Sequence, residues 1–342
     1  MNQHQIIRVA ASDIRQQLSL ILTNHRFSEE KARECAEIFT TNSLEGVYSH
    51  GLNRFPRFIE DVCKGLVLPD KEAQKISTAG CAEQWDGQSG PGPVNAMIAS
   101  RRAMQLATKY GIGMINLRNT NHWMRGGTYG QYCAQKGFFF AGWTNTIPNL
   151  PVWGSPENKL GNNPLVLAVP NQPDPVVLDM AMSQYSYGKL ETTARDTDLL
   201  PYPGGINKEG EFTRKASEIL ESQRPLPAGY WKGSSLSFVL DLFVSLLSGG
   251  KAVMDLKNSK NEEHQVSQLF LCIDPRHFPN YTAMAAQTRR MINDYLSART
   301  ENPFDQENKI HYPGQKAASI RQQNQKNGIP VPAELWQVIQ KL

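Results

Sequence analysis

Cysteine is scarce in this chain, and the few cysteines are scattered. The 342 residues contain five, and no two of them form a Cys-x-x-Cys pair: Cys35, Cys63, Cys81, Cys133 and Cys272. An odd number of widely spaced cysteines argues against a closed disulfide framework. The polar start MNQHQ also lacks the basic and apolar regions of a signal peptide. We therefore expect a protein of the reducing cytoplasm.

Neither an excess of charge of one sign nor a long apolar run is present. The formal net charge is only +4, and basic and acidic residues are mixed along the chain, unlike a nucleic-acid-binding surface. The longest apolar run, Leu236 to Leu247, contains Asp241 and is well short of the ~20 residues that span a bilayer. We expect a core helix that ends at Gly249-Gly250, and no binding to nucleic acid or membrane.

Several common ligand-binding motifs are absent as well. The sequence has no G-x-x-x-x-G-K-[ST] phosphate loop, no G-x-G-x-x-G after a strand and no G-x-S-x-G nucleophile motif. It also has no H-E-x-x-H or acidic-loop pattern, and its seven histidines are dispersed. These absences argue against a conventional Rossmann fold, and we predict no bound metal.

The length favours two closely packed lobes over a single domain. Helical patterns occur in the first ninety residues, where Ser12-Asp13 and Ser28 are the expected caps, and again at 95–110, 234–248, 282–297 and 332–342. Five apolar runs predict strands: GMINLRN, FFFAGWTNT, NPLVLAVP, PVVLDMAMS and QLFLCIDP. Because loops rich in proline and glycine separate some of these runs, a mixed or largely antiparallel sheet is favoured at least as much as a doubly wound one. The polar segment 192–227 is expected to run over the surface.

The segment YSHGLNRFPRF is the first candidate site, with Ser49 and His50 just before Gly51 and Arg54. An imidazole with a pKa near ~6.5 can exchange a proton with a carbonyl oxygen. The planar guanidinium of Arg54 can hold a carboxylate through two hydrogen bonds. We do not expect Ser49 to pair with His50, because adjacent side chains diverge. The alternative is that His50 caps a helix end and the arginines are solvated.

Three further segments carry polar groups. NTNHWMRGGTYG follows a predicted strand and contains His122 before two glycines that would let backbone approach a ligand. Asp179 ends the run PVVLD, where a buried carboxylate would need a partner such as an imidazolium. GYWKGS, with Trp231 and Lys232, combines aromatic rings, a cation and a helix start able to receive a phosphate. The alternatives are a buried structural histidine, a turn aspartate and an ordinary helix cap.

Taken in order, SHGLNRFPRF, RNTNHWMRGGTYG, WTNT, GNNPL, LDMAMSQYSYGKLE, GYWKGSSLSFVLDL, HYPGQ and KNGIPV resemble the type 2 malate and L-lactate dehydrogenase family over nearly the whole chain. The resemblance implies an α/β, malate/L-lactate dehydrogenase-like (L-sulfolactate dehydrogenase-like) fold rather than a Rossmann fold. Its mixed or largely antiparallel sheet would lie in a cofactor-binding lobe, residues 91–297, beside a helical lobe made of residues 1–90 and 298–342. It also implies a cytoplasmic homodimer that reduces a 2-oxo acid with NAD(P)H.

The same resemblance assigns roles to residues. His50 would be the proton donor with Asp179 near it, and Ser49, Arg54 and His122 would bind substrate. The cofactor-binding residues would be Pro175, Val176, Val177, Leu178, Asp179, Met180, Ala181, Trp231, Lys232, Gly314, Gln315 and Lys316.

The sequence leaves two choices open: the cofactor and the substrate. Relatives usually carry a carboxylate after the Pro-Gly of the C-terminal loop, where this chain has Gln315 and Lys316. A carboxylate would bind ribose hydroxyls and Lys316 would tolerate a 2′-phosphate, so the cofactor is NAD or NADP, with NADH favoured. The substrate is expected to be a 2-oxo sugar acid, with Trp123 and Trp153 suited to a polyhydroxy acid. Another 2-oxo acid, or a non-catalytic sugar-acid binding protein, is the alternative.

Overall fold

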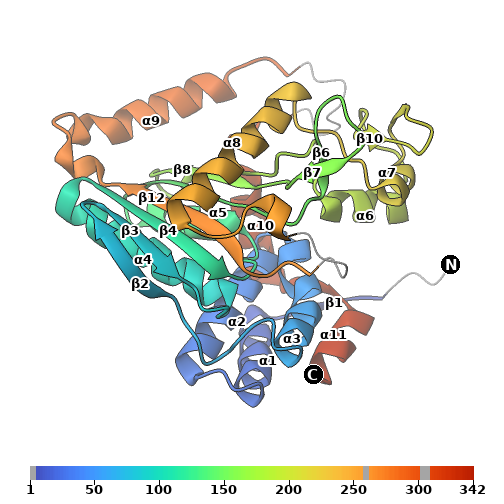
Figure 1. Ribbon diagram of the computed structural model, residues 1–342, viewed down its shortest axis with the longest axis horizontal. Coiled ribbons are helices and arrows are strands. Elements are labelled where there is room, and N and C mark those ends of the chain that lie inside the picture. The colour runs from blue at the N-terminus through green and yellow to red at the C-terminus, as the bar shows by residue number, and fades with distance from the viewer. Residues whose placement is uncertain (1–4, 257–261, 301–308) are drawn as a thin grey trace.

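The structure is a computed structural model that describes residues 5–256, 262–300 and 309–342. A seven-stranded sheet forms its middle layer (Figure 1). In spatial order its strands are β2 (Gln74–Ala79), β3 (Ala82–Asp86), β4 (Ile112–Thr120), β12 (Val266–Ile273), β5 (Phe139–Thr144), β8 (Leu165–Val169) and β9 (Val176–Met180). Only β3 and β4 pair in parallel; the other neighbours are antiparallel. The expectation of a mixed, largely antiparallel α/β sheet is therefore confirmed.

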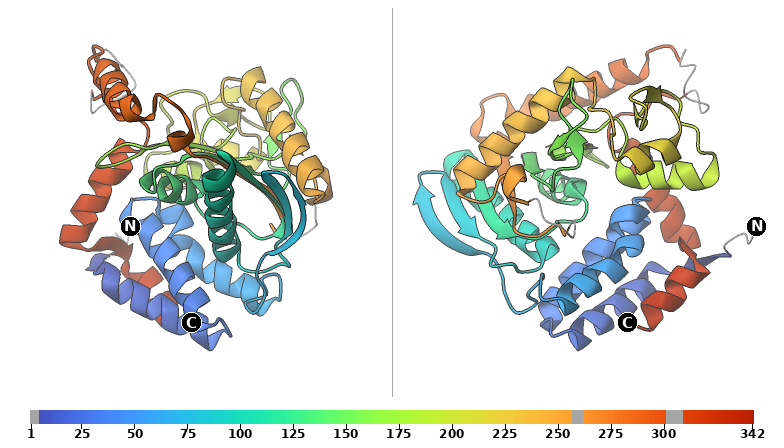
Figure 2. Two further views of the ribbon diagram at one scale, coloured as in Figure 1. Left: turned by 90° about the vertical axis from the view of Figure 1, so that its left-hand side faces the viewer. Right: turned by 45° about the vertical axis from the view of Figure 1, so that its right-hand side comes forward.

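Helices cover both faces of this sheet (Figure 2). The helices α4 (Gly92–Tyr110) and α5 (Gly126–Gln135) pack on one face, where Phe270 and Cys272 of β12 share their apolar cluster. The helix α8 (Trp231–Ser248) packs on the other face, and Trp143 of β5 donates a hydrogen bond to the Leu240 carbonyl. Within β5 itself, Phe140 and Trp143 enter two different apolar clusters on opposite faces of the sheet, as strand geometry requires.

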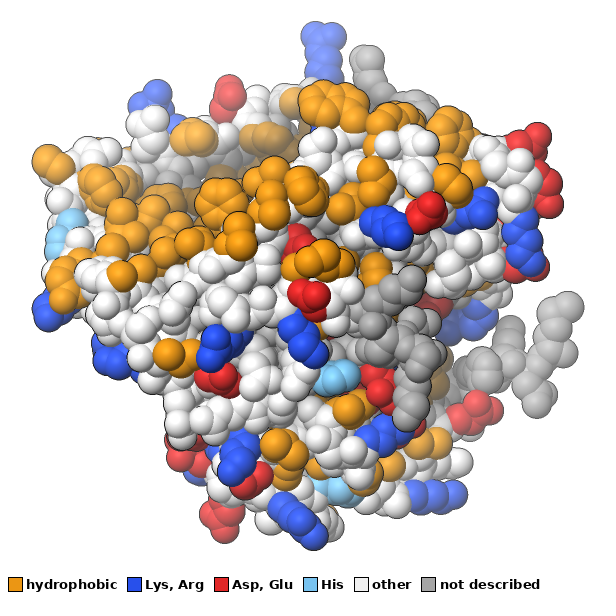
Figure 3. Space-filling view, in the orientation of Figure 1, with side chains coloured by type: hydrophobic (Ala, Val, Ile, Leu, Met, Phe, Trp, Pro, Cys, Tyr) orange, Lys and Arg blue, Asp and Glu red, His pale blue; other side chains and the backbone are white. Residues whose placement is uncertain are grey.

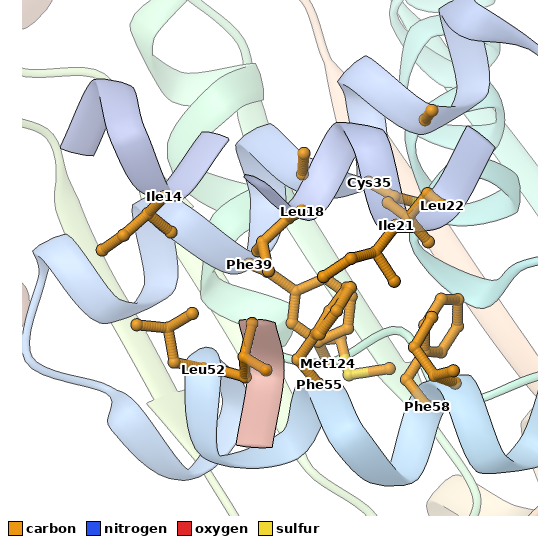
Figure 4. Close-up of a cluster of buried hydrophobic side chains, with 14 of the residues drawn as sticks. Ile14, Leu18, Ile21, Leu22, Cys35, Phe39, Leu52, Phe55, Phe58 and Met124 are labelled. Atoms are coloured by element: carbon orange, nitrogen blue, oxygen red, sulfur yellow. The ribbon is translucent and has the colours of Figure 1, made fainter. Parts of the chain in front are cut away.

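The two ends of the chain meet in a helical layer beside the sheet. The strands β1 (Ile6–Val9) and β13 (Ile329–Pro332) pair antiparallel. Around them lie α1 (Ala11–Asn24), α2 (Glu29–Leu44), α3 (Phe55–Cys63), α10 (Gln315–Asn327) and α11 (Ala333–Gln340). Figure 4 shows the apolar cluster of this layer, in which side chains such as Leu18, Phe39 and Phe55 are fully buried. This layer carries the first candidate site, because the Ser-His-Gly segment connects α2 to α3.

The remaining elements form the periphery. They are β6 (Leu150–Pro151), β7 (Asn158–Leu160), α6 (Tyr187–Asp196), β10 (Gly205–Ile206), β11 (Phe212–Thr213), α7 (Ala216–Ser222) and α9 (Tyr281–Leu296). The segment 192–227, expected to run over the surface, packs with Leu190 of α6 around a small core that also contains Leu200, Ala216 and Ile219. This small core was not predicted from the sequence, because it contains only a few apolar residues within a mainly polar segment.

Some local expectations are confirmed and others are wrong. Ser28 caps α2, accepting a hydrogen bond from the backbone of Lys31. Ser12-Asp13 does not cap α1, which begins after Ala10 without a side-chain cap. Residues 74–86, expected in the helical lobe, form strands β2 and β3 of the central sheet. The exposed, polar side chains of β2 explain why the alternation typical of a strand was not seen.

The helix α8 ends at Gly249 as expected, but it is not a core helix. Its outer face exposes large apolar side chains: Leu236, Phe238, Val239, Leu242, Phe243, Leu246 and Leu247. The apolar run that suggested burial all round is therefore buried on one face only. Within the described parts of the chain, no helix has the length and apolar character needed to cross a bilayer.

Candidate active site

The backbone of His50 is fixed by a buried amide. His50 ends a short 3-10 turn, Tyr48–His50, and its carbonyl accepts a hydrogen bond from Asn42 Nδ2 at 2.8 Å. Asn42 Oδ1 in turn accepts one from the Thr128 hydroxyl of α5 at 2.6 Å. Asn42 is fully buried, so its amide ties this turn to the sheet lobe. Sequence reasoning missed it; a polar residue on the buried face of α2 was the only signal.

Gly51 is required by a close approach to α2. A Cβ there would lie 2.1 Å from Ser43 Oγ. That oxygen accepts a hydrogen bond from the Leu52 amide at 2.8 Å. Any side chain at position 51 would push the turn off α2, so the glycine is what allows His50 to sit against the helix.

The imidazole of His50 contacts two of the predicted site residues. Ser49 Oγ lies 3.0 Å from His50 Nδ1, contrary to the expectation that neighbouring side chains diverge; the tight turn brings them together. The rings of His50 and His122 stack with centroids 5.6 Å apart and planes at 19°. His50 is therefore more than a helix-end cap. Burial, and then the charges of Arg54 and Arg125, lower the pKa of His50 to about 4.

His122 has a defined tautomer. Its Nδ1 accepts a hydrogen bond from the Met124 amide at 3.0 Å, so the proton of the neutral ring is on Nε2. That atom lies 3.9 Å from Glu263 Oε2. Burial, then the nearby charge of Arg54, holds the pKa of His122 well below its ordinary value. His122 is thus a neutral hydrogen-bond donor at neutral pH.

Arg54 lies at the start of α3 and faces the same hollow as His122. Its Nη2 is 4.0 Å from Glu263 Oε2, and its side chain keeps 25% of its surface exposed. The hollow is lined by Arg54, Phe58, Asp61, Leu66, Val67, Asn121, His122, Met124 and Glu263. The structure thus brings His122 close to the segment that contains Ser49, His50 and Arg54, although His122 lies 68 residues after Arg54 in the sequence. Asp61, Asn121 and Glu263 were not singled out from the sequence.

Asp179 has different partners from the one expected. Its Oδ2 accepts a hydrogen bond from the Gly127 amide at 2.8 Å and lies 3.8 Å from Arg125 Nε. No contact between Asp179 and His50 occurs in the described structure. Burial raises the pKa of Asp179, while Arg125 and the Gly127 amide oppose the rise. A guanidinium, rather than an imidazolium, therefore compensates this carboxylate.

Arg125 also belongs to a buried ionic network that connects the lobes. It pairs with Glu45, whose other oxygen accepts hydrogen bonds from Arg321 of α10 at 2.9 Å and Gln131 at 2.7 Å. Burial opposes ionisation of Glu45, but the Arg125, Gln131 and Arg321 contacts hold its pKa below the usual value. Arg321 also pairs with Asp174, just before β9. The network holds α10 and the start of β9 in one arrangement.

The predicted cofactor segments border the edge strand β9. At its start, the Val177 amide donates a hydrogen bond to the Pro313 carbonyl at 2.9 Å. Gly314 has φ +95°, and a Cβ there would lie 3.1 Å from Val177 N. Just past its end, the Ala228 amide donates to the Met182 carbonyl at 2.8 Å, which places the start of α8 there. Trp231, the first residue of that helix, is 60% exposed.

These features fit a dinucleotide. The strand β9 is the edge strand of the sheet and lies between two helix starts, with Pro313 bonded to its outer side at Val177. Its five residues span about 16 Å. Gly314 allows a close approach at one end, while Trp231 and Lys232 offer an aromatic face and a cation at the other. The expected segments are thus grouped around one strand, although they are distant in sequence.

Other motifs proved structural. Asn145 of WTNT donates a hydrogen bond to Asp241 of α8 at 3.0 Å, and Asn163 of GNNPL donates to the Ser237 carbonyl at 3.0 Å. Both hold α8 on the sheet.

Trp123 is 1% exposed and packs on Tyr129, so the suggestion that it suits a substrate is wrong. In the described part of the chain, no three His, Cys, Asp or Glu side chains group as metal ligands.

Comparison with known proteins places the chain. A family model described as malate/L-lactate dehydrogenase matches residues 9–340. The chain belongs to this family. It is 40% identical, over 98% of its length and all of the relative, to a 2,3-diketo-L-gulonate reductase of Escherichia coli O17:K52:H18, and 39% identical with the same coverage to that of Citrobacter koseri.

Solved structures of family members share the fold. Malate dehydrogenase from Pyrococcus horikoshii OT3 superposes with a TM-score of 0.87 at 28% identity, covering 98% of this chain and 95% of that one. Sulfolactate dehydrogenase from Methanocaldococcus jannaschii gives a TM-score of 0.88 at 23% identity, covering 97% and 95%. The chain is therefore an NAD(P)-dependent dehydrogenase of the malate/L-lactate dehydrogenase type, and its non-Rossmann fold is established.

Proposed function

We propose that this dehydrogenase reduces the C2 carbonyl of 2,3-diketo-L-gulonate to 3-dehydro-L-gulonate, with NADH as the favoured cofactor. The observation that supports the chemistry most directly is a chain of contacts: Ser49 contacts His50, His50 stacks on His122, and His122 lines a hollow together with Arg54. The 40% identity to a 2,3-diketo-L-gulonate reductase over the whole length supports the substrate.

In this proposal each side chain has one task. Arg54 holds the substrate carboxylate, which fixes the orientation of the neighbouring carbonyl group. A bound reduced nicotinamide supplies the hydride. His50 gives a proton to the C2 oxygen, and Ser49 at Nδ1 keeps the ring oriented so that Nε2 is available. The Nε2–H of His122 donates a hydrogen bond to a substrate oxygen. Asp179 acts on the site through Arg125.

The second candidate is the same chemistry on another 2-oxo acid. It is favoured by the fold that this chain shares with dehydrogenases named for malate and sulfolactate. A non-catalytic sugar-acid binding protein remains the remote alternative, and it has no use for the cofactor segments along β9.

The experiment that tests the proposed function is a substrate panel with NADH and NADPH, followed by the loss of absorbance of the reduced nicotinamide. We expect 2,3-diketo-L-gulonate to have the highest kcat/KM and NADH to be preferred. Much faster turnover of a smaller 2-oxo acid would reject the substrate, and a preference for NADPH would assign Lys316 to the 2′-phosphate. Absence of turnover together with absence of NADH binding would favour the binding protein.

We also propose that the protein is a cytoplasmic homodimer, with a second copy covering the outer face of α8. Figure 3 shows apolar side chains gathered on this side of the molecule, and α9 has no buried residue. A continuous apolar surface of this kind is typical of an interface between protein chains.

The five free cysteines support the proposed cytoplasmic location, because the cytoplasm is a reducing compartment. Cell fractionation would test this location.

Phe243→Glu is expected to turn the dimer into a monomer, because a charge in the middle of the apolar face would be desolvated without a partner. Sedimentation velocity measures the change. Leu20→Glu, at a side chain that is exposed on α1, is the matched control and should leave the mass unaltered. A wild-type protein that sediments as a monomer would contradict the dimer.

A further inference from the structure

The carboxylate of Glu263 lies among the side chains that the proposed function assigns to the substrate. Glu263 precedes β12, and its side chain keeps only 13% of its surface exposed. Its Oε2 lies 4.0 Å from Arg54 Nη2 and 3.9 Å from His122 Nε2. A carboxylate therefore lines the hollow in which an anionic substrate would be bound.

This carboxylate retains the capacity to accept hydrogen bonds. Distances of 3.9 and 4.0 Å are ion-pair distances, longer than those of hydrogen bonds. In the structure as described, no residue donates a hydrogen bond to Glu263. Its lone pairs can therefore accept from groups of a ligand, and hydroxyl groups are the donors that a sugar acid would offer.

The charged groups in and around the hollow balance one another before a ligand binds. Burial raises the pKa of Glu263, while Arg54 and Arg57 lower it and Asp61 raises it, so two cations and two carboxylates face one another. Both histidines are neutral. Among the described residues that line the hollow, Arg54 is the only cation. One carboxylate of a substrate can pair with Arg54, but a second would meet Glu263 in a medium of low dielectric.

We propose that Glu263 selects 2-oxo acids with a single negative charge and hydroxyl groups, and excludes dianionic 2-oxo acids. The inference rests on the proposed function only in that Arg54 holds the acid. The Glu263 carboxylate would accept hydrogen bonds from substrate hydroxyl groups, and it would repel a second carboxylate of the substrate. It explains how one family scaffold would separate sugar acids from dicarboxylic acids at the same arginine.

The test compares the wild type with Glu263→Gln on hydroxypyruvate, a hydroxylated monoanion, and oxaloacetate, a dianion. The wild type should prefer hydroxypyruvate in kcat/KM. The variant should shift this preference toward oxaloacetate by about tenfold or more, the size expected when one like charge is removed within several ångströms. Glu263→Asp should retain the wild-type preference because the charge remains.

The matched control is Glu262→Gln, since the adjacent carboxylate of Glu262 lies 3.9 Å from Lys64. It should not change the preference. Calorimetry with oxamate, a monoanion, and tartronate, a dianion, tests the same selectivity without turnover. The inference is overturned if Glu263→Gln leaves both the kinetic ratio and the ratio of the two affinities unaltered. Failure of every 2-oxo acid to consume NADH would reject the proposed function, and the calorimetric comparison would still decide the role of Glu263.

Discussion

His50→Gln is expected to lower kcat for reduction by roughly 10² to 10⁴-fold, the usual contribution of a positioned general acid. Glutamine fills a similar volume and can still donate a hydrogen bond, but it cannot transfer a proton. Stacking against His122 involves the ring and not the backbone, and the turn is held by Asn42, so the fold should persist. Steady-state kinetics measures the loss, and fluorescence titration should show unchanged binding of NADH.

The control for this variant is His277→Gln. His277 is exposed, and its Nε2 lies 3.1 Å from the Thr108 carbonyl, away from the hollow. Its turnover should equal that of the wild type. If His50→Gln also retained wild-type turnover, the proton would have to come from another group, and the assignment of His50 would be wrong.

The pH dependence of kcat/KM is the second large effect. The pKa of His50 is lowered to about 4, so the ring is neutral in the free protein at neutral pH. Reduction needs the protonated ring, and above the pKa the protonated fraction falls about tenfold for each pH unit. We therefore expect kcat/KM for reduction to fall about a hundredfold from pH 6 to pH 8. Oxidation of the product alcohol uses the neutral ring and should stay nearly flat.

The substrate itself should change this pKa. After burial, the charge of Arg54 is the largest cause of the lowered pKa of His50, and a bound carboxylate neutralises that charge. The decline of kcat, which reports the substrate complex, should therefore begin at a higher pH than the decline of kcat/KM. His50→Gln should remove both slopes. A flat profile of kcat/KM for reduction in the wild type would contradict proton donation by His50.

Much of the fold was accessible from local patterns. The five apolar runs predicted as strands all lie in the central sheet. The helix α4 ends at Tyr110, as its predicted range does, and Gly249 ends α8 as expected. Strands β2 and β3 were missed because β2 is polar and exposed and β3 carries mostly polar side chains. The burial of α8 was overestimated because apolar character does not tell whether a core or another chain covers a surface.

The site was accessible in part. The order of short motifs named the family and singled out Ser49, His50, Arg54 and His122. The fold places Arg54 and His122 at one hollow and stacks His50, with Ser49 beside it, on His122. Asn42 and Glu263 carried no such signal. The side-chain amide of Asn42 connects the turn at His50 to Thr128 of α5. The carboxylate of Glu263 lies near Arg54, which comes from a different segment. Neither contact could be predicted from the sequence, because each joins residues that are far apart along the chain.

The amino-acid order alone was enough to give the class of fold, the family and the residue types capable of proton transfer and carboxylate binding, because these depend on short-range periodicity and on motifs. Folding in three dimensions was needed to give Asp179 its arginine partner, His50 its lowered pKa and Glu263 its place beside Arg54. Burial and Coulomb interactions set these properties, and both depend on the distances between segments that are remote in sequence.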